Sequence, residues 1–212
     1  MAIYTVDVPV EKQAEHKACW ASICVAVVSA LRPNTPQKTP TNLYIEWENA
    51  TGKGGQDPQK VLKDEYKIDC TVEKFEGPVN GGDAIARALK MKEVIVNALK
   101  NGTPVICGMT THDDAPVGFT VTEPHQPVPW QHATLAFKCD TDLDLCWIRD
   151  PAPGGKNAAD AERSFTFTQL STGFDYMDKS NFGEKTKAML GEGAAVGILK
   201  ARVFKCIVPI KK

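Results

Sequence analysis

Apolar positions in the first half of this chain follow helical spacing. Those in the run from Ala18 to Leu31 cover more than one face, which predicts a helix that is buried on most sides. The prolines of Pro33-Asn34-Thr35-Pro36 end it. Three further helices are expected: Thr41–Asn49 with Thr41 as N-cap, Pro58–Tyr66 with Asp57 as N-cap, and a stretch from Gly81 to Lys100 before an Asn101-Gly102 stop.

The second half of the chain is dominated by short runs of β-formers. Together with the alternating segment Tyr4–Val10, they predict strands at Cys70–Phe75, Thr103–Met109, Ala133–Lys138, Leu145–Arg149, Phe165–Phe167 and Ala201–Ile210. A long, proline-rich loop at 110–129 is expected to form one wall of a cleft, and Gly191–Gly197 is expected to be a turn. Helices first and strands afterwards indicate an α+β fold. We expect a single domain of 1–212, with a helical lobe at about 13–100 and an antiparallel β lobe at about 103–212 that includes the N-terminal strand.

Composition and charge narrow the class of protein. Hydrophobic residues make up 42% and charged residues 24% of the 212 residues, as in ordinary globular domains. The net charge of −1 gives no electrostatic reason to expect nucleic-acid or membrane binding. No apolar run approaches the roughly 20 residues that span a bilayer, and the first residues do not resemble a Sec signal peptide. We therefore expect synthesis in the cytoplasm, and any export by a route that reads no cleavable signal.

The chain has seven cysteines, an odd number that argues against a closed disulfide framework. They form no CxxC pair and no histidines cluster beside them, so we expect no metal site. Cys24, Cys107, Cys146 and Cys206 lie in apolar surroundings, which is typical of small buried core residues. Cys139 is placed to pair with Cys146 across a hairpin, although a reducing cytosol disfavours a disulfide there.

The segment Gln13-Ala14-Glu15-His16-Lys17-Ala18-Cys19-Trp20-Ala21-Ser22 carries the strongest chemical signal. It places Cys19 at or near the first turn of the long apolar helix, where unpaired N–H groups and partial positive charge lower the pKa of a thiol. Gln13 would donate, with the backbone N–H of Cys19, to the oxyanion of a tetrahedral intermediate. The pattern indicates acyl transfer by a cysteine nucleophile; the competing interpretation is a buried core cysteine.

The spacing of this segment resembles that of the papain-like cysteine peptidases, which share Gln-x5-Cys-Trp-Ala at this point. Two later segments fit the resemblance: Trp130–Phe137 looks like the histidine strand of the family, and Cys146–Pro151 looks like the strand that ends in the residue orienting the histidine. The Asp-Pro pair is most similar to that of compact bacterial peptidases with a Cys-His-Asp triad, including avirulence effectors of plant pathogens. The resemblance covers about Val8 to Gly155. It departs from the pattern at Gln131, where many relatives have glycine, and does not reach 156–212.

The resemblance implies a papain-like fold with a cleft between the lobes and a triad of Cys19, His132 and Asp150. His132 would act as general base and then as general acid, and Asp150 would accept its other ring N–H and stabilise the imidazolium. The separation of the two residues suits adjacent antiparallel strands joined by a hairpin, because their outer ends then meet. Asp140, Asp142 and Asp144 would lie at the far end of that hairpin and are poor triad candidates.

The remaining candidates are weaker. His16 would approach the sulfur with poor geometry, and His112 and His125 are expected to be solvated within the long loop. Trp20 is expected to pack under the site. Trp147 would either shield the histidine–aspartate hydrogen bond from water or pack in the core.

These residues favour a cysteine peptidase that hydrolyses a peptide bond of a protein substrate through a thioester acyl-enzyme, without metal or cofactor. Because only twelve residues precede Gln13, we expect no N-terminal inhibitory propeptide of the lysosomal kind. Because an unrestrained protease endangers its maker, we expect an inhibitor protein, or delivery into another cell by a specialised secretion system. In the second case the protein would be a bacterial effector or toxin with a cognate immunity protein.

Two alternatives remain open at the level of the sequence. The same triad supports deamidation or transglutamination of glutamine side chains, since both reactions pass through a thioester. The other alternative is a catalytically silent papain-like fold that serves as a binding module or inhibitor. In that case Cys19 would react with an electrophile no faster than the other six cysteines.

Overall fold

The computed structural model describes residues 2–13, 17–75, 82–111, 131–151, 162–178 and 198–211. Its helices are α1 (Cys19–Leu31), α2 (Pro40–Thr51), α3 (Pro58–Tyr66), α4 (Gly82–Lys100) and α5 (Phe167–Thr172). Its strands are β1 (Ile3–Thr5), β2 (Cys70–Lys74), β3 (Val105–Thr111), β4 (Gln131–Asp140), β5 (Leu145–Arg149), β6 (Glu162–Thr166), β7 (Phe174–Asp178) and β8 (Ile198–Pro209). Almost all of the long loop, the Gly191–Gly197 turn, and His16, His112 and His125 lie outside the described residues.

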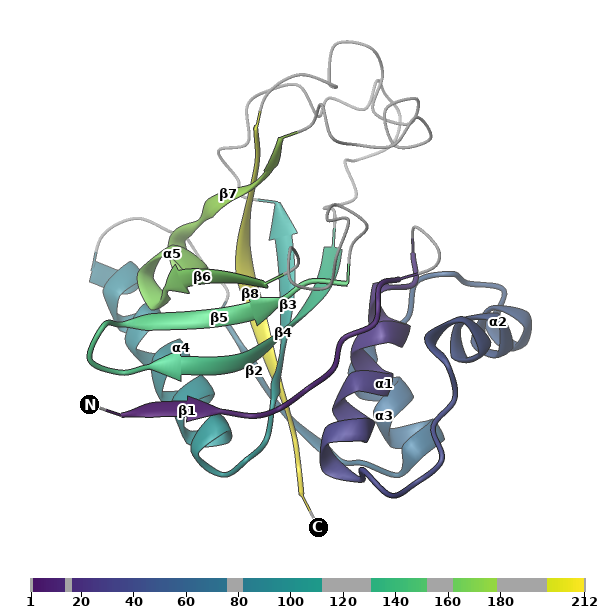
Figure 1. Ribbon diagram of the computed structural model, residues 1–212. Helices are drawn as coiled ribbons and strands as arrows, with labels where there is room; N and C mark the ends of the chain where they lie inside the picture. Colours follow the sequence, from purple (N-terminus) through teal and green to yellow (C-terminus); the bar gives the residue numbers. More distant parts are fainter. Residues whose placement is uncertain are drawn as a thin grey trace, which may run out of the picture.

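Figure 1 shows two lobes: α1, α2 and α3 gather on one side, and the strands with α4 and α5 form the other. Within the described ranges, eight strands form one sheet in the order β2-β8-β3-β4-β5-β6, with β1 paired to β4 and β7 to β8. Each of these pairs is antiparallel. The predicted α+β class is confirmed, with the helix that begins at Cys19 packed on an antiparallel β lobe.

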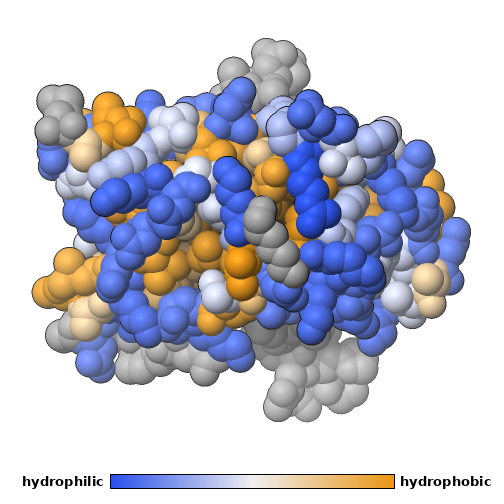
Figure 2. Space-filling model, turned by 90° about the horizontal axis from the view of Figure 1, so that it is seen from below, coloured by the Kyte–Doolittle hydropathy of each residue, from blue (hydrophilic) through white to orange (hydrophobic). Residues whose placement is uncertain are grey.

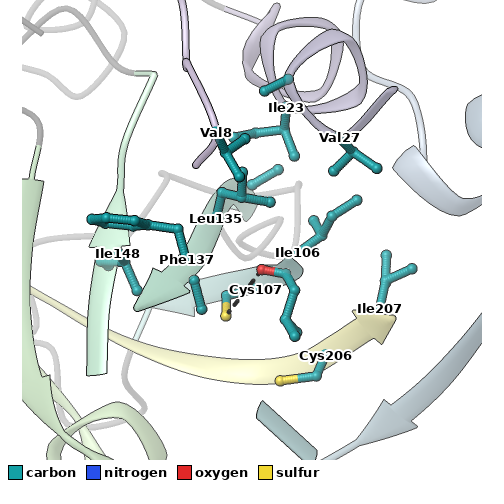
Figure 3. Close-up of a cluster of buried hydrophobic side chains, with 14 of the residues drawn as sticks. Val8, Ile23, Val27, Ile106, Cys107, Leu135, Phe137, Ile148, Cys206 and Ile207 are labelled. Carbon is teal, nitrogen blue, oxygen red and sulfur yellow. Dashed lines mark hydrogen bonds between the residues drawn. The ribbon is translucent and has the colours of Figure 1, made fainter. Parts of the chain in front are cut away.

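Helix α1 packs between the two lobes through hydrophobic side chains. It begins at Cys19 and ends at Leu31, as the apolar run predicts, and nine of its residues are buried. It packs against α2 and α3 in its own lobe and against β4 in the other. Figure 3 shows Ile23 of α1 beside Leu135 of β4 and Val8 of the N-terminal segment. Because these side chains are fully buried, they hold the start of α1 next to the sheet.

The caps of α2 and α3 test the predicted helix starts. Asp57 caps α3 as predicted, accepting a hydrogen bond from the Gln59 N–H at 3.1 Å. The prediction of Thr41 as the cap of α2 is wrong: Thr39 Oγ1 accepts from the Asn42 N–H at 3.2 Å. The helix starts earlier because Pro40 occupies N1, where its missing N–H and restricted φ carry no penalty.

The β4–β5 hairpin is confirmed. The two strands pair from Leu135 opposite Arg149 to Asp140 opposite Leu145, and residues 141–144 form the turn. The strand predicted over Phe165–Phe167 continues only to Thr166, which caps α5 with a reciprocal capping box. β1 is likewise shorter than the predicted Tyr4–Val10. These differences do not move the ends of the hairpin.

Helix α4 corrects the predicted boundary between the lobes. A helical lobe ending near residue 100 would include it, but it packs against α5 and the sheet. Its Lys92 donates to the carboxylate of Asp144 at 2.6 Å and to the carbonyl of Thr141, both in the turn of the hairpin. The amphipathic pattern of α4 predicts a buried face and carries no information about which lobe buries it.

The surface differs between the lobes. Figure 2, seen from below, shows hydrophobic side chains gathered over the sheet half of the molecule, whereas the half over α1–α3 is mainly hydrophilic. The large exposed hydrophobic residues in the sheet lobe are Ile3, Ile85, Leu89, Leu143 and Ile210. Among the described residues, no helix combines the length and hydropathy needed to cross a membrane.

Candidate active site

Cys19 is the first residue of α1, at the helix end where backbone N–H groups lack intrahelical partners. The N-cap residue, Ala18, offers no side-chain hydrogen bond, and the first turn contains no acidic residue. The backbone amides of Trp20, in α1, and of Ala133, on β4 in the other lobe, both act to lower the pKa of the Cys19 thiol. The sulfur therefore lies where the two lobes meet.

His132 and Asp150 form the second part of the site. Nε2 of His132 and Oδ1 of Asp150 are 2.6 Å apart, and both side chains are buried. Since Nε2 faces Asp150, Nδ1 is the ring nitrogen left for the hydrogen bond between His132 and Cys19. The structure thus brings together Cys19, His132 and Asp150, in the order that the sequence predicts.

The electrostatics favour a thiolate–imidazolium pair. Burial acts to raise the pKa of Cys19, but the hydrogen bond and charge of His132, with the two backbone donors, outweigh it and lower that pKa below 9.0. Burial acts to lower the pKa of His132, but the charge and hydrogen bond of Asp150, with those of Cys19, raise it from 6.5 to about 10. Each partner stabilises the charged form of the other, which favours transfer of the proton from the thiol to the imidazole.

These two shifts predict the pH dependence of any reaction that uses the pair. As the pH falls through the lowered pKa of Cys19, the thiolate is protonated and the rate falls. As the pH rises through about 10, His132 loses the proton that a leaving group needs. We expect a bell-shaped rate profile. Alkylation of Cys19 by iodoacetamide, followed by mass spectrometry, measures the acid limb; a midpoint at 9.0 or above would contradict this prediction.

Gln13 is buried and is attached to the same corner of the sheet. Its backbone N–H donates to the carbonyl of Pro151 at 2.8 Å, directly after Asp150. The segment before α1 is thereby tied to the strand end that orients His132. This places Gln13 in the neighbourhood of the site, and its role as an oxyanion donor remains a prediction.

If Gln13 is an oxyanion donor, Gln13→Ala should lower kcat about 10²–10³-fold with little change in KM, because the oxyanion forms only in the transition state. Initial rates at saturating and subsaturating substrate separate the two parameters. Gln37→Ala, which removes an amide in the α1–α2 connection, is the matched control. An unchanged kcat in Gln13→Ala would exclude Gln13 as an oxyanion donor.

The two remaining candidates are tryptophans. Trp20 packs on Tyr44 and Trp47 of α2, and its Nε1 donates to the Gly54 carbonyl at 2.8 Å. Trp147 is partly buried and packs against the hydrophobic core, which is the second of the two roles expected for it. It is three residues before Asp150, so its side chain lies on the other face of the strand, under the ammonium of Lys138.

Other predictions about polar residues and thiols can now be placed. Asp140, Asp142 and Asp144 lie at the turn of the hairpin, as predicted. Cys139 and Cys146 are direct cross-strand partners, and all seven thiols are free. In the part of the chain that the structure describes, no three His, Cys, Asp or Glu side chains are grouped so as to hold a metal ion.

Two contacts at the site were not predicted. The sulfur receives the backbone N–H of Ala133, and the backbone of Gln13 bonds to Pro151. Both contacts involve a backbone N–H group and join segments far apart in the sequence, so no residue type signals them. The Ala133 contact can be recognised only in the folded structure, where β4 packs against the start of α1.

Comparisons with known proteins find similarity only at the level of solved structures. No protein-family profile and no curated protein matches the sequence. Among solved structures, the chain is similar to UfSP from C. elegans, with a TM-score of 0.49 and 14% identity over 99% of this chain and 34% of that one, so it spans about a third of that protein's length. It is also similar to xylellain, a cysteine protease from Xylella fastidiosa, with a TM-score of 0.46 and 14% identity over 97% of this chain and 85% of that one. The chemistry of the site therefore rests on its own residues.

Proposed function

We propose that this protein is a papain-like cysteine peptidase that hydrolyses a peptide bond of a protein substrate. One observation carries the proposal: a buried Asp150–His132 hydrogen bond of 2.6 Å continues to a thiol at the start of a helix. A core cysteine requires neither a histidine partner nor a lowered pKa. Burial without such partners raises the pKa of Cys24 and Cys146 in this same protein.

The reaction would follow from the geometry. The thiolate of Cys19 attacks the scissile carbonyl, and the resulting oxyanion accepts hydrogen bonds from the Cys19 N–H and the Gln13 amide. His132 gives its proton to the leaving amine, and a thioester forms. Water, deprotonated by His132, then attacks the thioester and releases the acid product. Asp150 holds the imidazole in place through both steps.

The test compares wild type with Cys19→Ala, each expressed in a susceptible cell and followed by analysis of protein termini. New termini that require Cys19 support proteolysis and name the substrate. Glutamine side chains converted to glutamate, with a gain of about 1 Da each, or cross-linked to amines would instead identify the deamidase or transglutaminase alternative that shares the thioester chemistry. If Cys19 also reacted with an electrophile no faster than the other thiols, the silent binding module would be the better interpretation.

We further propose that the peptidase is a bacterial effector or toxin restrained by a partner protein. The support is that Cys19, His132 and Asp150 lie together in the folded chain, in surroundings that lower the pKa of the thiol. An enzyme in this state requires restraint in the cell that makes it. Co-purification from the native host should recover a stable inhibitor or immunity protein. A chain that has no partner and no toxicity when expressed alone would contradict this proposal.

A further inference from the structure

The Cys19–His132 contact spans the two lobes of the molecule. Cys19 belongs to α1 in the helical lobe, and His132 and Ala133 belong to β4 in the sheet lobe. Hydrogen bonds to sulfur weaken steeply when donor and acceptor separate. Contacts that set the spacing of the lobes near this point therefore bear on the reactivity of the thiol.

One row of the sheet connects this point to β8. Ala133 lies opposite Gly108 of β3, and Gly108 lies opposite Lys205 of β8. A Cβ at Gly108 would lie 2.7 Å from Cγ of Lys205 and 3.0 Å from its Cε, so the stem of Lys205 lies over Gly108 in space that only glycine leaves open. Ala133, Gly108 and Lys205 thus occupy neighbouring positions on the adjacent strands β4, β3 and β8.

The ammonium of Lys205 crosses to the helical lobe. Its Nζ lies 3.4 Å from Oδ1 and 3.3 Å from Oδ2 of Asp57. Asp57 is held in place because it caps α3, and the carbonyl of the next residue, Pro58, accepts the thiol of Cys24 from α1. The carboxylate is therefore attached to the lobe of Cys19, and the ammonium to the lobe of His132.

We propose that the Lys205–Asp57 ion pair is a positioning contact, which holds α1 against the sheet where His132 and Ala133 reach the sulfur of Cys19. The inference goes beyond the proposed function and rests on it only in taking Cys19 as the nucleophile. Neither residue touches the reacting atoms. Each acts through the spacing of the two lobes, with Gly108 as the residue that makes room for the contact.

Two substitutions separate positioning from a direct charge effect. Lys205→Met keeps a long stem over Gly108 and removes the charge, and Asp57→Asn keeps the helix cap and removes the opposite charge. A direct field would raise the pKa of Cys19 in the first variant and lower it in the second. Positioning predicts a rise in both, because each breaks the same contact, and predicts that the double variant is no worse than either single variant.

The experiment measures the rate of Cys19 alkylation by iodoacetamide across pH, by mass spectrometry, in wild type and each variant. Below the pKa, a rise of one unit lowers the thiolate fraction about tenfold, and we expect a rate about threefold to tenfold lower on the acid limb of the profile in both single variants. Lys205→Arg should restore the wild-type profile. Lys92→Met is the matched control, since it breaks the partly exposed Lys92–Asp144 ion pair within the sheet lobe.

The outcomes are distinct. A lower thiol pKa in Asp57→Asn, an unchanged profile in Lys205→Met, or an equal shift in Lys92→Met would each overturn the positioning role. The proposed function fails separately, if wild-type Cys19 itself shows no enhanced reactivity or if no cleavage depends on it. Melting temperatures recorded alongside distinguish lost positioning from lost folding, because a merely structural contact would lower the melting temperature without moving the pH profile.

Discussion

Replacing Cys19 with alanine is expected to lower kcat/KM for peptide-bond cleavage at least about 10⁴-fold, because nothing else in the site can form the thioester. The substitution removes the atom that receives hydrogen bonds from His132, Trp20 and Ala133. It should leave the fold intact, because Cys19 is only partly buried and alanine favours a helix. Cleavage of a labelled protein substrate measures the loss, and circular dichroism measures the fold.

Cys70 offers a matched control for this experiment. It is also a partly buried free thiol, but it lies on β2 at the edge of the sheet. Burial, followed by the charges of Asp69 and Asp57, raises its pKa to about 11, so it contributes little thiolate at neutral pH. Cys70→Ala should therefore keep wild-type activity. Activity that survives in Cys19→Ala and disappears in Cys70→Ala would show that Cys70, and not Cys19, is the nucleophile.

Replacing His132 with glutamine is the second large effect. Acylation should slow by at least about 10⁴-fold, since the general acid and the partner of the thiolate are lost together. Burial is the largest single influence on Cys19 and acts to raise its pKa. Without the opposing charge of His132, the pKa of the thiol should rise above its ordinary 9.0. The pH profile of alkylation measures this rise directly.

The control for His132→Gln is His125→Gln, which removes an imidazole from the proline-rich loop. It should keep the wild-type profile. If both variants shifted alike, the base would have been misassigned between the two histidines. If neither shifted, the lowered pKa of Cys19 would have to come from the backbone amides of Trp20 and Ala133 and not from His132.

Sequence patterns predicted the elements that carry the site more closely than those that do not. Helix α1, the Asp57 cap and the hairpin were predicted because each depends on local chemistry: an apolar run, an Asp-Pro pair, and two β-rich runs around a short polar turn. The Thr39 cap was missed, although the Pro40 that follows it signals a helix start. The α5 turn was missed because six residues carry too little periodicity.

What the sequence could not supply is long-range placement. α4 packs on the sheet, although its position in the chain suggests the helical lobe. The Gln13–Pro151 and Lys205–Asp57 contacts join segments more than a hundred residues apart. Such pairings depend on how the lobes meet, which no local pattern encodes. The triad residues could be named because short motifs carry them, while their supporting contacts required the fold.

The bare start of α1 has a cost that bears on engineering. An uncapped helix gives up about 1 kcal/mol relative to one with a serine or aspartate at the N-cap. Introducing such a cap is among the commonest routes to a more thermostable protein. If Cys19 is the proposed nucleophile, that route is closed at Ala18, because the new side chain would accept hydrogen bonds from the amides that the sulfur and the oxyanion would use. Thermal robustness and turnover are in direct conflict at this residue, so stabilising substitutions belong elsewhere in the chain.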